Sequence, residues 1–440
     1  MKKVEYFDQK VETSSRDETA MLQFQKLETL LKKVYTSNPF YQNKFNSLGI
    51  TSSEIRSLDD LTKLPFTVKK EFEKDQQEHP PFGTNLTEPL ENYVQYRQTS
   101  GTTGKPIKFL DTKESWQWRG KVACYILKAA GVTKEDRMLL PFNFGPYTAF
   151  WIMYEGGYQL GTLIIPTGGW NSLQRLQCIL ENRATVIPTT PSYALTLAET
   201  AKENHIDIAN SSVRILMLTG EPGALIPGIR EKLESHWNAR CFDVIGMTEV
   251  GTWGFQCTEE PNGVHILESE FIAEVIDPHT AIPVQEGEVG ELVVTNLGRS
   301  CMPSIRYRTG DLVKVKKGSC SCGRTFHVLD GGVLGRKDEM IIIRGVNVFP
   351  NVLTNIVESH IGPGDDYQIE VYEKKGINEM RIQLEIKEED RSKAIKQAIQ
   401  DEIRGKLNIR VEVNTIPKGT IPKSDYKAKR FIDRRKEGNV

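Results

Sequence analysis

The sequence predicts an α/β protein: a large N-terminal domain of helix-covered sheets with a small β subdomain, then a small C-terminal α+β domain. Between residues 114 and 245, short apolar runs alternate with helical patterns, which is typical of a parallel sheet covered by helices. Residues 265–315 change to short strand-like runs separated by turns, and residues 336–440 mix strand and helix patterns. We therefore expect domains over 1–335 and 336–440.

The first predicted elements lead the chain into a glycine-rich loop. Apolar residues at three-to-four spacing predict a helix over 17–47, and Pro39-Phe-Tyr breaks this pattern. Strands are predicted over 91–97 and 107–110. They flank the loop Thr99-Ser-Gly-Thr-Thr-Gly-Lys-Pro106 in a strand–loop–strand hairpin.

The same periodicities predict the remaining elements. Helices are expected over 114–130, 150–160, 171–182, 193–204, 225–236, 350–359 and 391–407. Strands are expected over 137–140, 163–166, 185–188, 213–219, 240–245, 271–276, 290–295, 312–316, 340–343, 367–373 and 380–386. In parallel sheets, ligands bind at the carboxyl ends of the strands. The loops 189–193, 219–222 and 246–249 each follow a strand there.

The composition excludes several classes of function. The 440 residues are 38% hydrophobic and 26% charged, which describes an ordinary soluble globular protein. A net charge of -1 provides no basic field for nucleic acid or for an anionic membrane. No apolar run approaches the ~20 residues of a transmembrane helix, and the first residues lack the apolar core of a secretory signal. Seven scattered cysteines favour reduced thiols in the cytoplasm, or a metal, over a disulfide scaffold.

The glycine-rich loop has the composition of a phosphate site. Glycines, hydroxyls and a lysine within a few residues can surround phosphates with backbone and side-chain donors. The spacing is not that of a P-loop, because Lys105 is followed by a proline and not by a hydroxyl residue. Taken alone, the run could equally be a polar turn between two strands, with Lys105 in solvent.

Further motifs follow this loop in a set order. They are Gly246-Met-Thr-Glu249, Tyr307-Arg-Thr-Gly-Asp311, Gly335-Arg-Lys-Asp338 with Arg344-Gly345, and a lysine near the C-terminus. In this order they resemble the adenylate-forming enzymes, which include acyl-CoA synthetases, adenylation domains and luciferases. Four further stretches and the short overall length make the chain most similar to phenylacetate–CoA ligases: Pro39-Phe-Tyr, Ser57-Leu-Asp-Asp-Leu with Leu64-Pro-Phe-Thr67, Thr190-Pro-Ser-Tyr193 and Gly345-Val-Asn-Val-Phe-Pro350.

The resemblance implies an ATP site. The implied nucleotide contacts are Ser100, Gly101, Thr103, Gly104, Lys105, Gly220, Glu221, Pro222, Asp243, Ile245, Gly246, Met247, Thr248, Asp311 and Arg336, with Thr102, Glu249 and Lys427 as catalytic residues. Glu249 would bind Mg²⁺, which needs few carboxylates beside phosphate oxygens. Asp311 would accept both ribose hydroxyls. The ordinary alternatives are a helix cap for Glu249, a turn for Asp311 and a linker for Arg336. Ile245 replaces the tyrosine that stacks on adenine in the family.

Lys427 is the implied catalytic lysine of the C-terminal segment. Its ammonium would meet the charge that develops between the carboxylate and the α-phosphate. Tyr426 replaces the glycine that precedes this lysine in related ligases. A solvated basic tail is the alternative, with Lys423 and Lys429 as fallback candidates. Rotation at Asp338 would exchange Lys427 for the Arg344-Gly345 face in the thiol step.

A second set of residues is independent of ATP. Cys257, His265, Cys320 and Cys322 resemble a Cys/His set found in many of these relatives. Three thiolates and one imidazole make a closed, structural zinc site without an open position for catalysis. Buried free thiols are the alternative, and His327 is a rival ligand.

The acid would lie among aromatic residues. The expected contacts are Phe144, Tyr147, Phe150, Tyr193 and Thr219. They suit an aromatic or apolar acid, although packing alone also accounts for such residues. Phe150 stands where phenylacetate ligases usually have glycine, so it would fill or reshape the pocket.

The sequence therefore predicts an ATP-dependent ligase that adenylates an aromatic or apolar carboxylic acid and transfers it to coenzyme A. It would use ATP, Mg²⁺, coenzyme A and structural Zn²⁺. One alternative passes the acyl group to a carrier protein or an amine. Another is a non-catalytic nucleotide-binding homologue. The family also suggests a homodimer.

Overall fold

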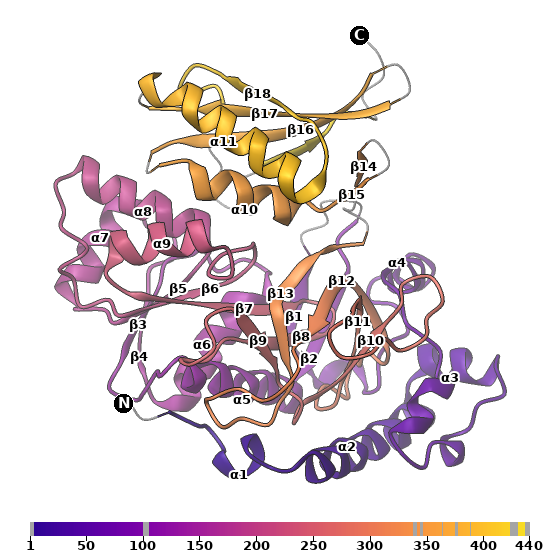
Figure 1. The fold of residues 1–440 in the computed structure, drawn as a ribbon. Coiled ribbons are helices and arrows are strands. Elements are labelled where there is room, and N and C mark those ends of the chain that lie inside the picture. The colour runs from indigo at the N-terminus through magenta and orange to yellow at the C-terminus, as the bar shows by residue number, and fades with distance from the viewer. Residues whose placement is uncertain are drawn as a thin grey trace.

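A mixed sheet forms the centre of the large domain (Figure 1). The structure is a computed structural model that describes residues 4–99, 105–337, 341–343, 346–362, 364–374, 377–387, 389–422 and 430–435. Within these residues the sheet has eleven strands in the order β10-β11-β12-β13-β9-β8-β7-β6-β5-β3-β4. The α/β fold class is therefore confirmed.

One half of the sheet is parallel. Its strands are β3 (Arg137–Leu140), β4 (Leu163–Pro166), β5 (Val186–Thr189), β6 (Ile215–Leu218) and β7 (Arg240–Met247). Every residue of β5 and β6 is buried, as expected for parallel strands covered on both faces. The helices that alternate with them are α5 (Lys113–Ala129), α6 (Thr148–Leu160), α7 (Ser172–Glu181), α8 (Pro191–Glu203) and α9 (Pro227–Trp237).

Two of these helices, α5 and α6, pack at close range. A Cβ added at Gly156 would lie 2.4 Å from the Cβ of Ala123, so only glycine permits this approach. Cys124 on α5 also donates to the carbonyl of Gly156 at 3.5 Å. The contact fixes α6, which begins next to the predicted acid pocket.

The other half of the sheet is antiparallel and continues the parallel half. Its strands are β8 (Gly251–Phe255), β9 (Gly263–Ile266), β10 (Phe271–Ile276), β11 (Val289–Asn296), β12 (Tyr307–Val315) and β13 (Val328–Arg336). The predicted β subdomain is thus part of the large sheet. Strands β8, β9 and β13 were not predicted, because glycines at 251, 254, 263, 331, 332 and 335 weaken their pattern.

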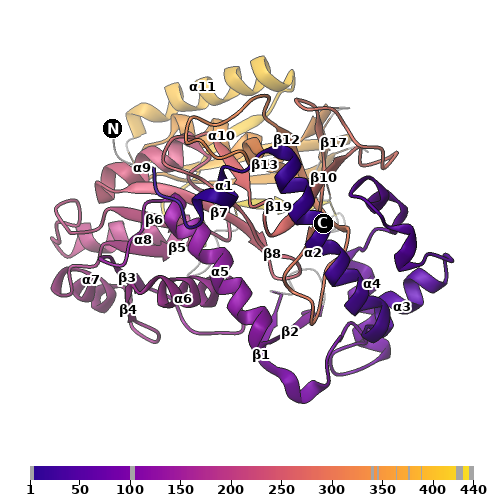
Figure 2. The same cartoon turned by 90° about the horizontal axis from the view of Figure 1, so that it is seen from below.

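The N-terminal helices run along the outside of the large domain (Figure 2). They are α1 (Gln9–Glu12), α2 (Arg16–Ser37), α3 (Pro39–Asn46) and α4 (Lys69–Glu78), with 3-10 turns at Ser52–Glu54, Asp59–Lys63 and Leu90–Asn92. The hairpin of β1 (Tyr93–Gln98) and β2 (Lys108–Thr112) follows them, and β2 is largely buried. The helix predicted over 17–47 is two helices. Asn38 ends α2 and caps α3 by accepting from the backbone N–H of Tyr41, and Pro39 takes the first helical position.

The C-terminal segment has its own sheet and core. It contains β14 (Ile341–Ile343), β15 (Val346–Val348), α10 (Pro350–His360), β16 (Asp366–Lys374), β17 (Ile377–Glu385), α11 (Glu389–Leu407), β18 (Glu412–Thr415) and β19 (Phe431–Asp433). Strands β16 to β19 form a separate sheet in the order β18-β17-β16-β19. A buried cluster runs from Ile341 to Val413 within this segment. The boundary near 335–339 remains a prediction, and residues 338–340 lie outside the described ranges.

Helix α10 connects this segment to the large domain, where it lies beside α9 (Figure 1). The buried carboxylate of Glu358 accepts from Lys232 of α9 at 2.6 Å and also pairs with Arg430. Gly228 of α9 lies against the backbone of Glu358, since a Cβ there would be 2.6 Å from its carbonyl oxygen. The two parts therefore meet through a specific contact.

Among the helices in the described part of the chain, none combines the length and the apolar character needed to cross a membrane.

Candidate active site

The three predicted strand-end loops lie together, because β5, β6 and β7 are neighbours in the sheet. Thr190 caps the N-terminus of α8, where its hydroxyl accepts from the backbone N–H of Tyr193 at 3.2 Å. Ser192, two residues after Thr190, donates its backbone N–H to the carboxylate of Glu221 at 2.7 Å. This bond joins the loop after β5 to the loop after β6. Glu221 is half-buried, and Gly220 and Pro222 beside it are exposed.

Asp243 holds the loop after β6 in place through hydrogen bonds. Its two carboxylate oxygens accept from the backbone N–H groups of Ala224 and Leu225, each at 2.8 Å. The side chain is buried, and burial raises the pKa of Asp243 to about 6 against these hydrogen bonds. In this structure the carboxylate thus shapes the turn beside Glu221, and its contact with adenine stays a prediction.

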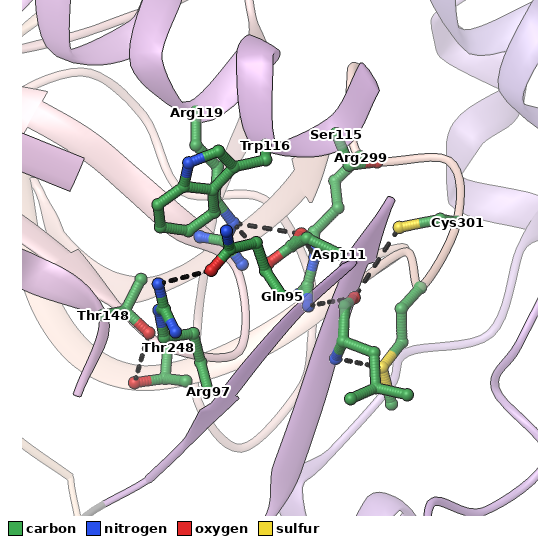
Figure 3. Close-up of polar contacts among 12 residues, drawn as sticks. Gln95, Arg97, Asp111, Ser115, Trp116, Arg119, Thr148, Thr248, Arg299 and Cys301 are labelled. Carbon is green, nitrogen blue, oxygen red and sulfur yellow. Dashed lines mark hydrogen bonds and ion pairs between the residues drawn. The ribbon is translucent and has the colours of Figure 1, made fainter. Parts of the chain in front are cut away.

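Glu249 follows β7 and is held through its backbone. Its carbonyl oxygen accepts from the hydroxyl of Ser304 at 2.7 Å and from Arg299 at 3.2 Å. The side chain is 8% exposed, and burial raises the pKa of its carboxyl group. Thr248, the preceding residue, lies 3.5 Å from Thr148 at the start of α6 (Figure 3). Gly246, Met247 and Thr248 are exposed or half-buried around it.

A buried ion triad anchors this loop (Figure 3). Asp111 at the end of β2 pairs with Arg119 of α5 at 3.1 Å and with Arg299 at 2.8 Å. The three side chains are at most 1% exposed. Burial alone would raise the pKa of Asp111, but the two guanidinium groups hold it below its usual value. The triad links the hairpin that carries the glycine-rich loop to Arg299, which holds the backbone of Glu249.

Arg97 lies on the other strand of the hairpin, just before the glycine-rich loop (Figure 3). Its guanidinium carbon is 4.6 Å from the ring centre of Trp116 and 4.8 Å from that of Trp151. Its hydrogen bonds go to the carbonyl of Tyr96 and the side-chain oxygen of Gln95. Burial lowers the pKa of Arg97 to about 10. The arginine thus joins β1 to α5 and α6 through cation–π contacts.

Asp311 and Arg336 come together although they are distant in sequence. They face each other across β12 and β13, and their side chains form an ion pair at 3.1 Å. Asp311 is nearly buried, whereas about a third of the Arg336 side chain is exposed. The pair therefore places a carboxylate and a guanidinium side by side where β13 ends, and their contact with a ribose stays a prediction.

A cavity of about 310 Å³ opens at the carboxyl ends of β3, β4 and β5. Of the residues predicted for the acid, Phe150 and Tyr193 line it. Phe150 stacks on Phe142 with ring centres 4.0 Å apart, so it is part of the wall. Phe144 packs behind this wall against Phe142 and Trp151, Tyr147 is 40% exposed, and Thr219 is half-buried after β6.

Polar residues that we did not predict also line the cavity. They are Asn143, Asn171, Ser172, Arg175 and Thr190. Arg175 is 7% exposed and lies on the buried face of α7 with Leu176, Cys178 and Ile179. An arginine on the apolar face of an amphipathic helix is a sequence signal for a buried charge, and it could have identified this residue.

Several predicted residues lie where the structure gives no description. Ser100, Gly101, Thr102, Thr103 and Gly104 are outside the described residues, as are Asp338, Arg344, Gly345, Lys423, Tyr426, Lys427 and Lys429. Lys105, at the edge of the loop, is described and is exposed. Ile245 lies on β7 and packs at the border of the main core.

The predicted metal ligands converge. One ligand atom from each of Cys257, His265, Cys320 and Cys322 lies within 4.8 Å of the others, and all four residues are buried. The sulfurs of Cys257 and Cys320 are 3.7 Å apart, and that of Cys322 is 3.6 Å from the Nε2 atom of His265. Ligands at about 2.3 Å and 2.0–2.1 Å around a tetrahedral zinc ion would have similar separations. The rival ligand His327 instead bonds Glu268 at 2.8 Å.

Comparisons with known proteins identify the family of this chain. Residues 43–303 match the model of the AMP-binding enzyme family, and residues 345–435 match the AMP-binding enzyme C-terminal domain. The phenylacetate-coenzyme A ligase of Thermus thermophilus is 32% identical, over 98% of this chain and 100% of its own length. The Escherichia coli protein of the same name is 32% identical over 97% of both chains.

Solved structures of a 2-hydroxyisobutyryl-CoA ligase resemble the whole chain. In the postadenylation state with R3-HIB-AMP, the TM-score is 0.91 at 25% identity, over 98% of this chain and 93% of that one. In the thioesterification state with 2-HIB-AMP and CoA, the TM-score is 0.74 at 26% identity and the same coverage. The arrangement described here is therefore nearer to the postadenylation state. The family models and the full-length relatives together show that this chain belongs to the AMP-binding enzyme family.

Proposed function

We propose that this chain is an ATP-dependent, AMP-forming acid–thiol ligase. It activates a small carboxylic acid with an aromatic or apolar body as the acyl adenylate and transfers the acyl group to coenzyme A. The single observation that supports this best is full-length similarity to two phenylacetate-coenzyme A ligases. The aromatic wall of Phe142, Phe150 and Trp170 in the cavity suits such an acid.

In this proposal the chain acts mainly by positioning and by neutralising charge. The loop 99–106 grips the phosphates that leave, and Asp311 with Arg336 holds the ribose. The carboxylate of Glu249 binds Mg²⁺, which would offset charge on the phosphates when bound. The Ser304 and Arg299 contacts to the Glu249 carbonyl keep this residue in place. Lys427 donates to the carboxylate and α-phosphate oxygens during adenylation.

The experiment that tests the proposal is ATP–pyrophosphate exchange with a panel of aryl and aliphatic acids. We expect some acids to stimulate exchange without coenzyme A, and the acyl thioester to form only when coenzyme A is added. Exchange without thioester would favour a carrier protein or an amine as acceptor. Measurable ATP binding without exchange for any acid would favour a non-catalytic homologue.

The cysteine and histidine cluster is proposed to hold structural Zn²⁺. Around it, the hydroxyl of Tyr6 donates to the carbonyl of Cys322 at 2.5 Å, and Arg324 pairs with Glu12 at 2.6 Å. A metal there would tie the turn of Cys320 and Cys322, which Tyr6 contacts, to the strands β8 and β9. It supplies no chemistry to the reaction, because three thiolates and an imidazole complete a tetrahedral shell.

We expect protein purified without added zinc to contain stoichiometric zinc. Cys257→Ser should lower the stability of the fold by several kcal/mol, because metal binding contributes folding free energy. Cys178→Ser, a buried free cysteine outside the cluster, is the matched control. Metal analysis with thermal unfolding measures both. Substoichiometric metal in a fully stable and active protein would remove the zinc site.

Two further expectations complete the proposal. All seven cysteines are free in the structure, which fits a reducing compartment such as the cytoplasm. The homodimer stays a prediction of the family resemblance, and sedimentation equilibrium would test it.

A further inference from the structure

The cavity beside the predicted adenylation site is lined by residues of two chemical kinds. Phe142, Phe150 and Trp170 are aromatic and suit an aromatic or aliphatic body. Arg175, Tyr193 and Asn143 are charged or polar. An activated carboxylate needs no arginine here, since the predicted phosphate and metal residues lie on other loops. Activation of the acid therefore does not account for the arginine in the lining.

Arg175 is a buried cation with neutral partners. Its Nε atom donates to the carbonyl of Thr167 at 3.3 Å, and its terminal nitrogens donate to the hydroxyl of Tyr193 at 2.6 Å and the amide oxygen of Asn143 at 3.4 Å. Among the described residues, no carboxylate forms an ion pair with it. These bonds use three of the five guanidinium N–H groups.

Most of the other buried arginines have carboxylate partners, whereas Arg97 lies between the rings of Trp116 and Trp151. Arg299 is paired with Asp111, Arg324 with Glu12 and Arg306 with Glu274. Burying a charge without a counter-ion is costly, so proteins usually supply a carboxylate. Arg175 has no such carboxylate among the described residues, and it lines a cavity. The anionic oxygen of a ligand could accept hydrogen bonds from the remaining N–H groups of Arg175. A carboxylate matches the fork geometry of a guanidinium.

The cavity also borders one of the loops of the proposed reaction. Phe150 lies two residues after Thr148, whose hydroxyl is 3.5 Å from that of Thr248 in the loop of Glu249. Thr190 borders the cavity, and Ser192 beside it bonds Glu221 of the next loop. Arg175 lies on α7, which follows β4 in the chain, and it lines the same cavity.

We propose that Arg175 selects a carboxylic acid with a second anionic group, a carboxylate at the end of the acid that is not activated. The inference rests on the proposed ligase function and narrows its substrate class. Tyr193 and Asn143 orient the guanidinium, which also stacks on the Tyr193 ring with 5.3 Å from its carbon to the ring centre. The aromatic wall holds the body between the two carboxylates.

The test compares matched acids in pyrophosphate exchange: phenylacetate against 4-carboxyphenylacetate, and benzoate against terephthalate. We expect kcat/KM to be higher for the dianion of each pair. Arg175→Gln should lower it for the dianion by about 10- to 100-fold, mostly through KM, because charge-assisted hydrogen bonds have that strength. The monoacids should change little. Arg175→Lys should restore part of the dianion preference, and the exposed Arg56→Gln is the matched control.

Several results would overturn the inference. A purely structural arginine predicts equal losses for both acids of a pair in Arg175→Gln. A preference for 4-hydroxyphenylacetate over 4-carboxyphenylacetate would mean that Arg175 binds a neutral group of the acid. If Arg175→Gln left pyrophosphate exchange unchanged and raised only the KM for coenzyme A, the guanidinium would be assigned to binding of coenzyme A.

Calorimetry of each acid with the full-length protein separates this inference from the ligase proposal. Tighter binding of the dianion that Arg175→Gln removes would support the inference even if no acid stimulated exchange. Equal binding of both acids of a pair would overturn it while leaving ligase turnover untouched.

Discussion

Lys427→Ala is expected to reduce acyl-adenylate formation by about 100- to 1000-fold or more, the loss seen when a donor to developing charge is removed. Thioester formation from a supplied acyl adenylate should be spared, because the lysine acts only in the first half-reaction. Pyrophosphate exchange measures the first step, and release of AMP from the supplied adenylate with coenzyme A measures the second. Loss of the first step with retention of the second would identify Lys427 as a residue of the adenylation step.

Two lysine controls sharpen this test. Lys418 is exposed and lies before the basic tail, so Lys418→Ala should leave both half-reactions unchanged. Lys429→Ala tests the fallback assignment, since it lies two residues after Lys427. If Lys427→Ala slowed both half-reactions equally, the assigned role would be wrong.

Asp111→Asn is expected to destabilise the protein by about 3–5 kcal/mol, because it leaves Arg119 and Arg299 buried without a counter-charge. The change is nearly isosteric, so a cavity does not contribute. Denaturant unfolding with a two-state fit to the major transition measures the free energy. We also expect a lower kcat at temperatures where the variant is folded, since Arg299 holds the carbonyl of Glu249.

The control for this variant is an exposed ion pair. Glu28 and Lys32 of α2 are 3.2 Å apart, and both side chains are more than half exposed. Glu28→Gln should cost about 0.5 kcal/mol or less, because water screens such pairs. A loss below about 1 kcal/mol for Asp111→Asn would mean that the triad is not a net electrostatic anchor.

The sequence predicted the parallel half of the sheet and the cysteine cluster well. Strands such as Val186–Thr189 are continuous apolar runs between amphipathic helices, a pattern typical of buried parallel strands. Cys257 and Cys320 are distant in sequence, yet their resemblance to a Cys/His set of the related enzymes indicated one site, and the structure brings them together. Local residue types carried the information for the strands, and the resemblance carried it for the cluster.

The parts that were missed depend on tertiary packing. Asp111, Arg119 and Arg299 have ordinary charged side chains, and only the fold brings them together without water. Arg175 was not predicted, because the aromatic residues near Phe150 indicate an apolar pocket. The antiparallel strands that contain Gly254 and Gly332 had weak local preference, and pairing with neighbouring strands determines them.

The N-terminal segment has a consequence for the order of folding. Glu12 and Arg324 are 312 positions apart in sequence, yet they form a fully buried ion pair. During synthesis, Glu12 of the first helix therefore cannot form this ion pair until most of the chain has left the ribosome. Contacts of such long range close late, because a large loop must be ordered first. The start of this chain is thus among the last parts to reach its final environment, which includes the turn of Cys320 and Cys322 next to Arg324.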